Sequence, residues 1–307
     1  LDDSGRVDAN FSETITLTLS QGTGRLYNVA AQAVNGVAAF SNLLYVAGAD
    51  GETFIVSAND QDDVGSNLPS LLSVSVASDI LATQLVFETQ PSGAVSGRPF
   101  VVQPVVKAVN DSGQVDMSFT DLITLSESGV GALGQASLLA TLGVAAFTEV
   151  TYTTSLDGET IALVADDGSG GVEGDLGAVQ SGALLSDIVG TRLVFTTQPT
   201  GSVSGKPLTG QPIVTALDDS GRVDTDFSEQ VTLTMAQGNG RLYNASVLAS
   251  EGVGTFNNVT YVASSDGESL ILEVNDDDGN GSDLPRVSAN VLLSDIIATQ
   301  LAFDTQP

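Results

Sequence analysis

Cysteine, histidine and tryptophan are absent from the 307 residues of this chain. The lack of cysteine excludes disulfide bridges and thiol nucleophiles, and the lack of both cysteine and histidine excludes the usual zinc sites. Without histidine there is no Ser-His-Asp triad and no imidazole to transfer protons. Aromatic residues make up only 5% of the sequence, so the hydrophobic cores must be built mainly from Val, Leu, Ile and Ala.

Basic residues are also scarce. Nine Lys and Arg stand against 38 Asp and Glu, which gives a formal net charge of −29. Nucleic acids and anionic membranes need a positive surface, so neither is expected as a partner. No apolar run approaches the ~18 residues of a membrane-spanning helix, so no direct membrane insertion is expected in this segment. The charge suits a soluble surface, a saline exterior or divalent cations, and composition alone does not choose among them.

The chain does contain a long repeat. Two tripeptides recur with a spacing of 108 residues: Asp-Ser-Gly begins at Asp3, Asp111 and Asp219, and Thr-Gln-Pro begins at Thr89, Thr197 and Thr305. A unit of this length is a whole domain rather than one turn of a solenoid, so we expect tandem domains. The copies are not equally alike, because residues 1–28 and 217–244 share the sequence GRLYN where the middle copy has GALGQ. This hints at an alternating array with a two-domain super-repeat.

Each copy has short strands separated by turn signals and no convincing helical period. In the middle copy the expected strands lie in residues 83–91, 100–109, 118–128, 143–154, 160–166 and 178–188. Phe119, Ile123 and Leu125 mark a buried side, and most aromatics keep the same place in every copy, as core packing demands. The pattern predicts an all-β chain of tandem immunoglobulin-like antiparallel β-sandwich domains with a period of about 108 residues.

Three stretches of the middle copy, ATQLVFETQPSGAVSGRPF, VVKAVNDSGQVD and GVAAFTEVTY, resemble the bacterial immunoglobulin-like (Big-type) repeats of large surface proteins. Those proteins include invasin- and intimin-type adhesins. The resemblance implies an extracellular or cell-surface stalk, fibre or adhesin array without catalytic residues. The expected domains are a partial repeat that lacks its first strands (1–81), two complete repeats (82–189 and 190–297), and the first strand of a further repeat (298–307).

Acidic residues are concentrated in loops and linkers. In the last copy Asp276, Asp278 and Asn280 fit the D-x-[DN]-x-[DN]-G spacing of calcium loops. In an immunoglobulin-type sandwich, the loop after the second strand, the loop before the last strand and the incoming linker share one pole. Carboxylates that converge there would repel one another unless cations bridge them. We therefore expect calcium at the domain junctions. The candidate ligands are Asp79, Asp111, Asp116, Asp166, Asp167, Asp175, Asp187, Asp219, Asp224, Asp276, Asp278 and Asn280.

Other interpretations stay open. The same Asp side chains could simply cap turns by accepting hydrogen bonds from their own backbone. Paired carboxylates could hydrolyse glycosides, but these acids recur in every copy beside glycine, so an enzyme is not expected. The chain could instead be a calcium-dependent module that binds a carbohydrate or another surface ligand. Finally, residues 298–307 could add a strand to an identical chain in a fibre, although neighbouring repeats of the same chain are the simpler partners.

Overall fold

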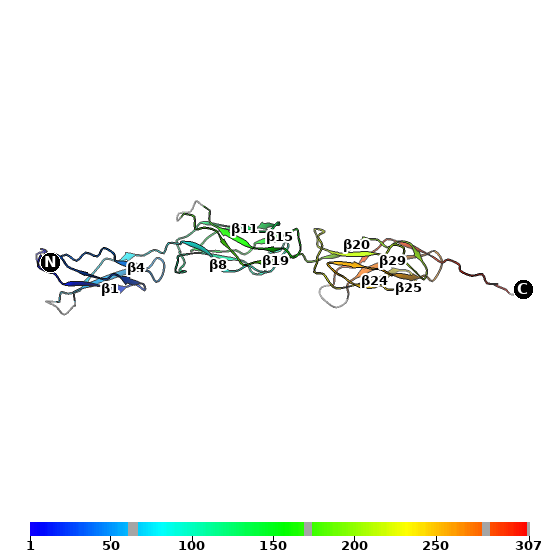
Figure 1. The fold of residues 1–307 in the computed structure, drawn as a ribbon, viewed down its shortest axis with the longest axis horizontal. Coiled ribbons are helices and arrows are strands. Elements are labelled where there is room, and N and C mark those ends of the chain that lie inside the picture. The colour runs from blue at the N-terminus through cyan, green and yellow to red at the C-terminus, as the bar shows by residue number, and fades with distance from the viewer. Residues whose placement is uncertain (61–66, 169–173, 278–282, 306–307) are drawn as a thin grey trace.

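The computed structural model describes residues 1–60, 67–168, 174–277 and 283–305. In this part of the chain every regular element is a β-strand, and no helix has the length and apolar character needed to cross a bilayer. Figure 1 shows an elongated molecule whose two termini lie at opposite ends. The expected all-β fold is confirmed.

The strands pair within three groups that follow one another along the chain. The groups span residues 14–77, 84–187 and 192–295, and no described strand pairs outside its own group. We call these parts of the chain the first, second and third units, and Figure 1 shows them in a row. The boundaries expected from the sequence, at residues 81/82 and 189/190, stay predictions that unfolding experiments can test.

The described strands of the first unit are β1 (Thr14–Gln21), β2 (Arg25–Tyr27), β3 (Ala30–Gln32), β4 (Leu44–Val46), β5 (Thr53–Asn59), β6 (Leu71–Leu72) and β7 (Val76–Ala77). Those of the second unit are β8 (Gln84–Thr89), β9 (Ala94–Val95), β10 (Val105–Val109), β11 (Leu122–Glu127), β12 (Ala132–Gly134), β13 (Ser137–Leu139), β14 (Val144–Ala146), β15 (Thr151–Thr153), β16 (Thr160–Ile161), β17 (Leu163–Asp166), β18 (Val179–Gln180) and β19 (Leu184–Asp187).

The described strands of the third unit are β20 (Arg192–Thr197), β21 (Ser202–Val203), β22 (Lys206–Pro207), β23 (Ile213–Leu217), β24 (Gln230–Gln237), β25 (Arg241–Tyr243), β26 (Ser246–Leu248), β27 (Val253–Thr255), β28 (Thr260–Val262), β29 (Glu268–Asn275), β30 (Val287–Ser288) and β31 (Leu292–Asp295). This unit repeats the main strand orders of the second one: β20-β23-β27 matches β8-β10-β14, and β26-β24-β29-β30 matches β13-β11-β17-β18.

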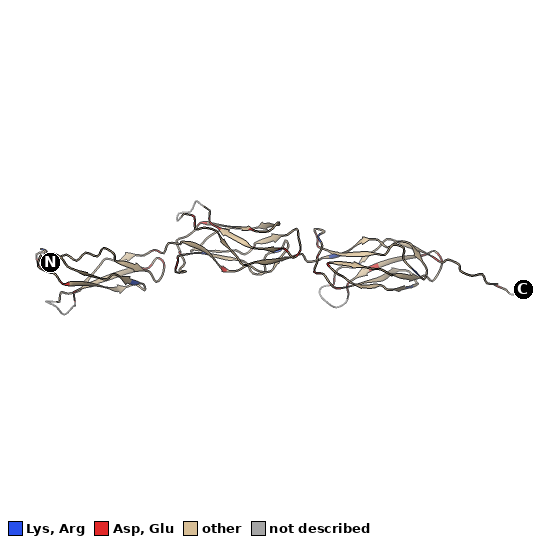
Figure 2. Ribbon diagram, viewed as in Figure 1, with Lys and Arg blue, Asp and Glu red and all other residues tan. Residues whose placement is uncertain are grey.

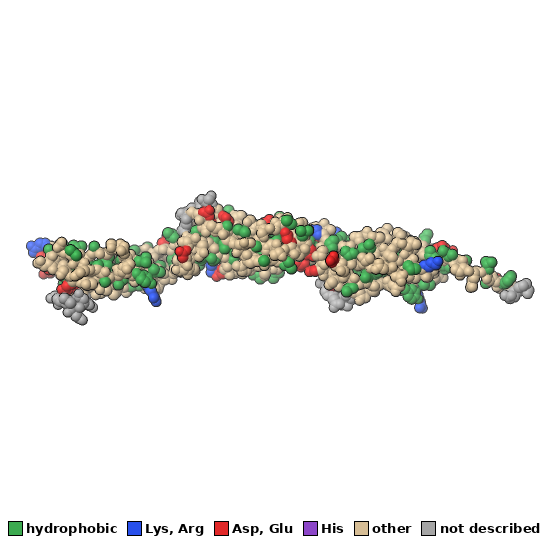
Figure 3. Space-filling model, in the orientation of Figure 1, with side chains coloured by type: hydrophobic (Ala, Val, Ile, Leu, Met, Phe, Trp, Pro, Cys, Tyr) green, Lys and Arg blue, Asp and Glu red, His purple; other side chains and the backbone are tan. Residues whose placement is uncertain are grey.

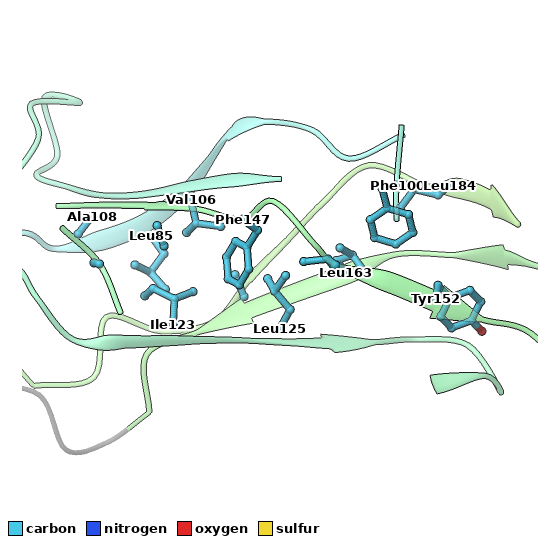
Figure 4. Packing of buried hydrophobic residues seen from close by; sticks show 14 of the residues in the cluster. Leu85, Phe100, Val106, Ala108, Ile123, Leu125, Phe147, Tyr152, Leu163 and Leu184 are labelled. Carbon is cyan, nitrogen blue, oxygen red and sulfur yellow. The ribbon is translucent and has the colours of Figure 1, made fainter. Parts of the chain in front are cut away.

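Two sheets enclose the core of the second unit. Alternate residues of a strand face opposite sides of a sheet, so Val106 and Ala108 of β10 turn to the core together. Ile123 and Leu125 of β11 do the same from the opposite sheet. Figure 4 shows these side chains meeting between the sheets, with Phe147 among them. The predicted immunoglobulin-like sandwich and the predicted buried side of residues 118–128 are therefore confirmed.

Several predicted strands are divided in two because the chain changes its pairing partner within them. Residues 143–154 form β14, which pairs with β10, and β15, which pairs with β12. Residues 160–166 form β16, which pairs with β19, and β17, which pairs with β11. Two short described pairs are parallel within this antiparallel sandwich. The short strand β9 runs parallel to β19, and β21 runs parallel to β31.

The first unit buries its aromatic side chains less completely than the other two units. Phe11, Phe40 and Tyr45 are partly exposed, whereas their counterparts in the second and third units are buried. The two clusters of buried apolar side chains found among the described residues belong to the second and third units. Residues 298–305 contain no strand, and Leu301 and Phe303 in this stretch are exposed.

Candidate functional site: the junctions between units

Acidic side chains gather where consecutive units meet. Figure 2 shows few charges along the sheets, and Figure 3 shows red side chains grouped between the second and third units. Each junction combines a turn of the preceding unit, the linker, and the loop after the second main strand of the following unit.

At the first junction, Asp50 joins three parts of the chain. Its Oδ1 accepts hydrogen bonds from the N–H of Gly51, at 2.8 Å, and from the linker N–H of Ile80, at 2.7 Å. Its Oδ2 accepts the N–H of Met117 in the second unit, at 2.7 Å. One carboxylate therefore connects the end of the first unit, the linker and the next unit.

The second junction is built in the same way around Asp157. Its Oδ1 accepts the N–H of Gly158 at 3.0 Å and that of Ile188 in the linker at 2.7 Å. Its Oδ2 accepts the N–H and the Oγ1–H of Thr225 in the third unit, at 2.8 and 2.7 Å. Desolvation pushes the pKa of Asp157 upward, but the hydrogen bonds from Thr225 and Ile188 outweigh it and hold the pKa below its ordinary value. We call Asp50 and Asp157 the clamp residues.

A buried Asp on the other side of each junction binds the end of the linker. Asp116 is fully buried, and its Oδ2 accepts the N–H of Ala82 at 2.9 Å. Asp224 is also buried, and its Oδ2 accepts the N–H of Gly190 at 2.7 Å. The linker is thus held by a carboxylate of each neighbouring unit, which limits the directions it can take.

A polar side chain adds a second contact between the units at each junction. The Nε2 of Gln114 donates to the carbonyl oxygen of Ala47 at 2.9 Å. Arg222, the residue at the same place one unit later, donates to the carbonyl oxygen of Thr154 and forms an ion pair with Asp218 at 2.7 Å. Both contacts connect the Asp-Ser-Gly loop with the preceding unit.

The turn that carries each clamp residue is fixed by a tyrosine and a glutamate. In the second unit the Oη of Tyr152 donates to Glu159 at 2.7 Å and accepts the N–H of Gly131 at 2.9 Å. Tyr45 donates to Glu52 at the same distance in the first unit. Glu159 also accepts the N–H of Val130 at 2.7 Å. In the Asp-Gly-Glu sequence, the Glu therefore fixes the turn within its own unit, and the Asp binds the neighbouring unit.

These contacts bring several carboxylates close together. Oxygen atoms of Asp50, Asp79 and Asp116 lie within 4.8 Å of one another at the first junction. Desolvation raises the pKa of Asp79, and the nearby charges of Asp50 and Asp116 raise it further. Asp187, the corresponding linker residue, also has a raised pKa because of desolvation and the charges of Asp157 and Asp224.

The second junction has one carboxylate more than the first. Oxygen atoms of Asp157, Asp224 and Asp226 lie within 4.8 Å of one another. A hydrogen bond with Asp224 and desolvation raise the pKa of Asp226 to about 6. The first junction has Ser118 at this place, and its Oγ donates to Asp116 at 2.7 Å. A proton on Asp226 can therefore make the contact that a serine hydroxyl makes at the first junction.

The substitution Asp226→Ser is expected to remove a pH dependence of the second junction. The pKa of Asp226 is about 6 in the folded chain and about 3.8 in a free carboxyl group. The stabilisation is therefore fully present below pH 3.8 and is lost as the pH rises to about 6. Because Asp226 is exposed, screening should leave an effect of about 1 kcal/mol. Melting curves between pH 4 and 8 should show the variant gaining stability relative to the wild type as the pH rises. Parallel curves would contradict the assignment.

The structure brings oxygen atoms of the predicted ligands Asp79 and Asp116 within 4.8 Å of each other at the first junction. At the second junction Asp187 lies near enough to Asp224 for the charge of Asp224 to raise its pKa. Others have local hydrogen bonds. Asp111 and Asp219 each accept the Oγ1–H of a threonine, Thr83 or Thr191, at 2.6 Å. The remaining described candidates accept backbone N–H groups of their own loops: Asp166 from Gly168, Asp167 from Leu176, Asp175 from Gly177, and Asp276 from Leu284. Asp278 and Asn280 lie outside the described residues.

A third acidic group lies in the last loop of the third unit. It consists of Asp276, Asp277 and Asp283, whose oxygen atoms lie within 4.8 Å of one another. Desolvation raises the pKa of the fully buried Asp276, and the charges of Asp283 and Asp277 raise it further. Arg286 forms an ion pair with Asp277, which supplies part of the opposite charge.

Sequence reasoning missed the two clamp residues as members of the site. Asp-Gly-Glu recurs in the sequence from Asp50, Asp157 and Asp266, but Asp50 and Asp157 were not among the candidate ligands. Their recurrence next to a glycine is also what an ordinary turn requires. No sequence signal places this turn at the pole that meets the next unit, because Asp50 and Asp157 precede their linker partners Ile80 and Ile188 by 30 and 31 residues.

The donor set of the junctions fits a hard divalent cation, because calcium prefers carboxylate and carbonyl oxygens. Asp79 and Asp187 could supply oxygen ligands together with Asp116 and Asp224. The clamp residues already accept three or four hydrogen bonds each, so they have less capacity to bind an ion.

No protein-family profile matches the sequence, and a comparison with curated protein sequences gives no match either. Among solved structures, the bacterial integrin-binding protein invasin aligns with 92% of this chain at 11% identity and a TM-score of 0.42. The match covers 53% of the invasin chain, so this chain spans about half its length. Domains EC1–3 of protocadherin gamma C5 align with 92% of this chain and 89% of their own length, at 14% identity and a TM-score of 0.41. The FN1–FN3 domains of chicken CNTN1 align over 94% and 91%, at 11% identity and a TM-score of 0.34.

Proposed function

We propose that this chain is a non-enzymatic, load-bearing segment of an extracellular or cell-surface protein, such as a stalk, fibre or adhesin array of Big-type repeats. The observation that carries this proposal is the repeated clamp. Asp50 and Asp157 each hold the linker and the following unit through the two oxygens of one carboxylate. Two joints made in the same way produce an extended chain with a repeating geometry, which is what a spacer requires.

The path of the chain through each unit also suits a load. Strand β9, near the start of the second unit, lies parallel to β19, which is the last strand of that unit. The N–H of Ser96, next to β9, donates to the carbonyl oxygen of Asp187 in β19 at 2.8 Å. In the third unit β21 and β31 repeat the arrangement, with Ser204 and Asp295 at the same distance. A force along the chain pulls such parallel strands past each other, so their hydrogen bonds must break together rather than one after another.

Single-molecule pulling on the two ends of the chain tests this function. The second and third units should each unfold in a separate event at a force well above that needed to stretch an unfolded chain. Each event should release a segment with a contour length of about 350 Å, because roughly 100 residues extend by about 3.5 Å each, and the chain should lengthen by this value less the length of the folded unit. A smooth extension without separate events would contradict a load-bearing role.

Calcium at the junctions is a second part of the proposal. It is supported by the three carboxylates within 4.8 Å at each junction and by the raised pKa values of Asp79 and Asp187. A divalent cation would offset this repulsion more strongly than a proton at neutral pH. The affinity should be that of other extracellular modules, about 10⁻⁴ to 10⁻³ M.

Calcium at millimolar concentration is therefore expected to raise the melting temperature and to reduce bending at the junctions, as measured by calorimetry and X-ray scattering against a chelator. The double variant Asp79→Asn and Asp187→Asn should lose both responses while keeping its fold. Asp111→Asn with Asp219→Asn is the matched control, because these residues bond to threonine hydroxyls beside the junctions. Identical wild-type curves with calcium and with chelator would exclude the cation without affecting the pulling result.

A further inference from the structure

The first and third units share a surface feature that the second unit lacks. Strands β2 and β25 have the same sequence, Arg-Leu-Tyr. Residues two apart in a strand face the same side, so the Arg and Tyr of each strand point outward together. Tyr27 and Tyr243 are equally exposed, at 47%. We call Arg25 with Tyr27, and Arg241 with Tyr243, the Arg-Tyr patches.

The patch of the third unit lies in a shallow hollow. Arg241, Tyr243 and Met235 line it together with small and apolar residues of β24 and the chain after β25. Met235 is 37% exposed and offers an apolar floor beside the tyrosine ring. Figure 1 places β25 along one edge of the third unit, and Figure 3 shows basic side chains projecting from that edge beside hydrophobic ones.

The backbone next to each patch is also special. The pairing of β24 with β29 shifts by one residue between Met235 and Gln237, and the pairing of β1 with β5 shifts between Leu19 and Gln21. The following residues Gly238 and Gly22 have φ angles of 123° and 119°, which favour glycine. Such bulges change the direction of neighbouring side chains and are found next to functional sites.

The second unit lacks every one of these features. The pairing of β11 with β17 runs without a shift, and Glu127 stands at the position of Met235. Ala132 and Gly134 stand where the other units have the Arg and the Tyr. The residue between them is still a leucine that packs on the core, Leu133. The fold therefore requires the leucine but not the patch.

The last residue of the shared GRLYN sequence has a structural role, in contrast to the Arg and the Tyr. The Nδ2 of Asn28 donates to the carbonyl oxygen of Asn42 at 2.8 Å, and that of Asn244 donates to the carbonyl oxygen of Asn258 at 3.0 Å. In the described parts of the chain, the side chains of Arg25 and Arg241 form no ion pair or hydrogen bond. Arg98 of the second unit is also exposed and has no ion pair in the described parts of the chain, so the feature that sets Arg25 and Arg241 apart is the exposed tyrosine two residues further along the strand.

We infer that the first and third units each bind an acidic saccharide at the Arg-Tyr patch. The tyrosine ring offers a flat apolar face on which a sugar ring can stack, and the guanidinium of the neighbouring arginine can hold a carboxylate or sulfate with two parallel hydrogen bonds. A saccharide with isolated anionic groups suits the site better than an acidic protein segment, because a chain with a net charge of −29 repels a dense run of carboxylates more strongly. Two patches on alternate units allow one long saccharide to bind twice, which increases its apparent affinity.

Titration of the 307-residue chain with three probes tests this inference: an oligosaccharide of six uronic acids, its carboxyl-reduced neutral counterpart, and a hexaglutamate peptide. Only the acidic oligosaccharide should bind, and its affinity should fall as salt is added. The double variant Arg25→Ala and Arg241→Ala should weaken binding at least about tenfold, as should Tyr27→Ala with Tyr243→Ala. Phenylalanine at both tyrosine positions should preserve binding, because stacking needs only the ring.

Arg98→Ala is the matched control, since it removes an exposed arginine from the second unit without touching either patch. It should leave the affinity unchanged, and circular dichroism should show that every variant is folded. Equal binding of the neutral oligosaccharide, equal loss in the Arg98 variant, or no binding of any probe would overturn the inference. Tighter binding of hexaglutamate would also overturn it and would indicate a protein partner. None of these outcomes bears on the pulling experiment.

Discussion

Replacing Asp157 by alanine is expected to uncouple the second and third units. The change removes the acceptor of the hydrogen bonds from Ile188 in the linker and from Thr225 in the third unit. Hydrogen bonds to a charged group are stronger than average, and two backbone donors would lose their partner, so the junction should lose about 2 kcal/mol. Asp157→Asn should give a smaller effect, because the side-chain amide oxygen can still accept one of these hydrogen bonds. The effect should not vanish, because the NH2 group of the amide would face an N–H donor of the junction.

Alignment measurements by NMR provide the readout. In the wild type the second and third units should share one alignment tensor, and in the Asp157→Ala variant each unit should have its own. X-ray scattering should show a wider distribution of lengths at the same time. Asp166→Ala is the control, because the side-chain hydrogen bond that Asp166 makes with the described residues is local: it accepts the N–H of Gly168 in its own loop at 2.6 Å. A shared tensor in the Asp157 variant would show that the carboxylate does not hold the joint.

Leu163→Ala is expected to produce the largest loss of stability, and only in the second unit. Leu163 is fully buried between the two sheets, as Figure 4 shows. Truncation of a buried leucine usually costs about 3 kcal/mol, which for a domain of this size lowers the melting temperature by about 15 °C. The third unit has its own core around Leu272, so its melting should not change.

Calorimetry should therefore show the transition of the second unit at a lower temperature and the transition of the third unit unchanged. Leu122→Ala on the exposed side of β11 is the matched control and should shift neither transition by more than a few degrees. If the whole chain melted earlier as one unit, the domain boundaries expected at residues 81/82 and 189/190 would be wrong.

The sandwich could be predicted because its pattern is local. Alternation of apolar residues within residues 118–128 indicated the buried side of β11, and the fixed places of the aromatics indicated the core. The division of residues 160–166 into β16 and β17 could not be predicted, because it depends on which distant strand each half meets. The parallel pairing of β9 with β19 could not be predicted for the same reason, since the two strands are separated by most of the unit.

The junction was only half predictable. Asp79 and Asp116 drew attention because acidic loops and linkers are visible in a sequence. Asp50 looked like an ordinary turn residue, and only the packing of two units shows that its Oδ2 accepts the N–H of Met117. Asp111 was predicted as a ligand, but its carboxylate accepts a hydrogen bond from the hydroxyl of Thr83, and no sequence pattern shows that contact.

Each clamp residue accepts a main-chain N–H of the following unit, and Asp157 also accepts the Oγ1–H of Thr225. The main-chain contact has a consequence for how such proteins diversify. The N–H that binds the clamp belongs to a methionine at one joint, Met117, and to a threonine at the other, Thr225. Because every residue except proline has this N–H, the joint tolerates drift in the neighbour's side chains. After gene duplication, one copy can acquire or lose a feature such as the Arg-Tyr patch without altering the angle to the next. Units joined in a new order should therefore keep the same hydrogen bond between the clamp residue and the following unit.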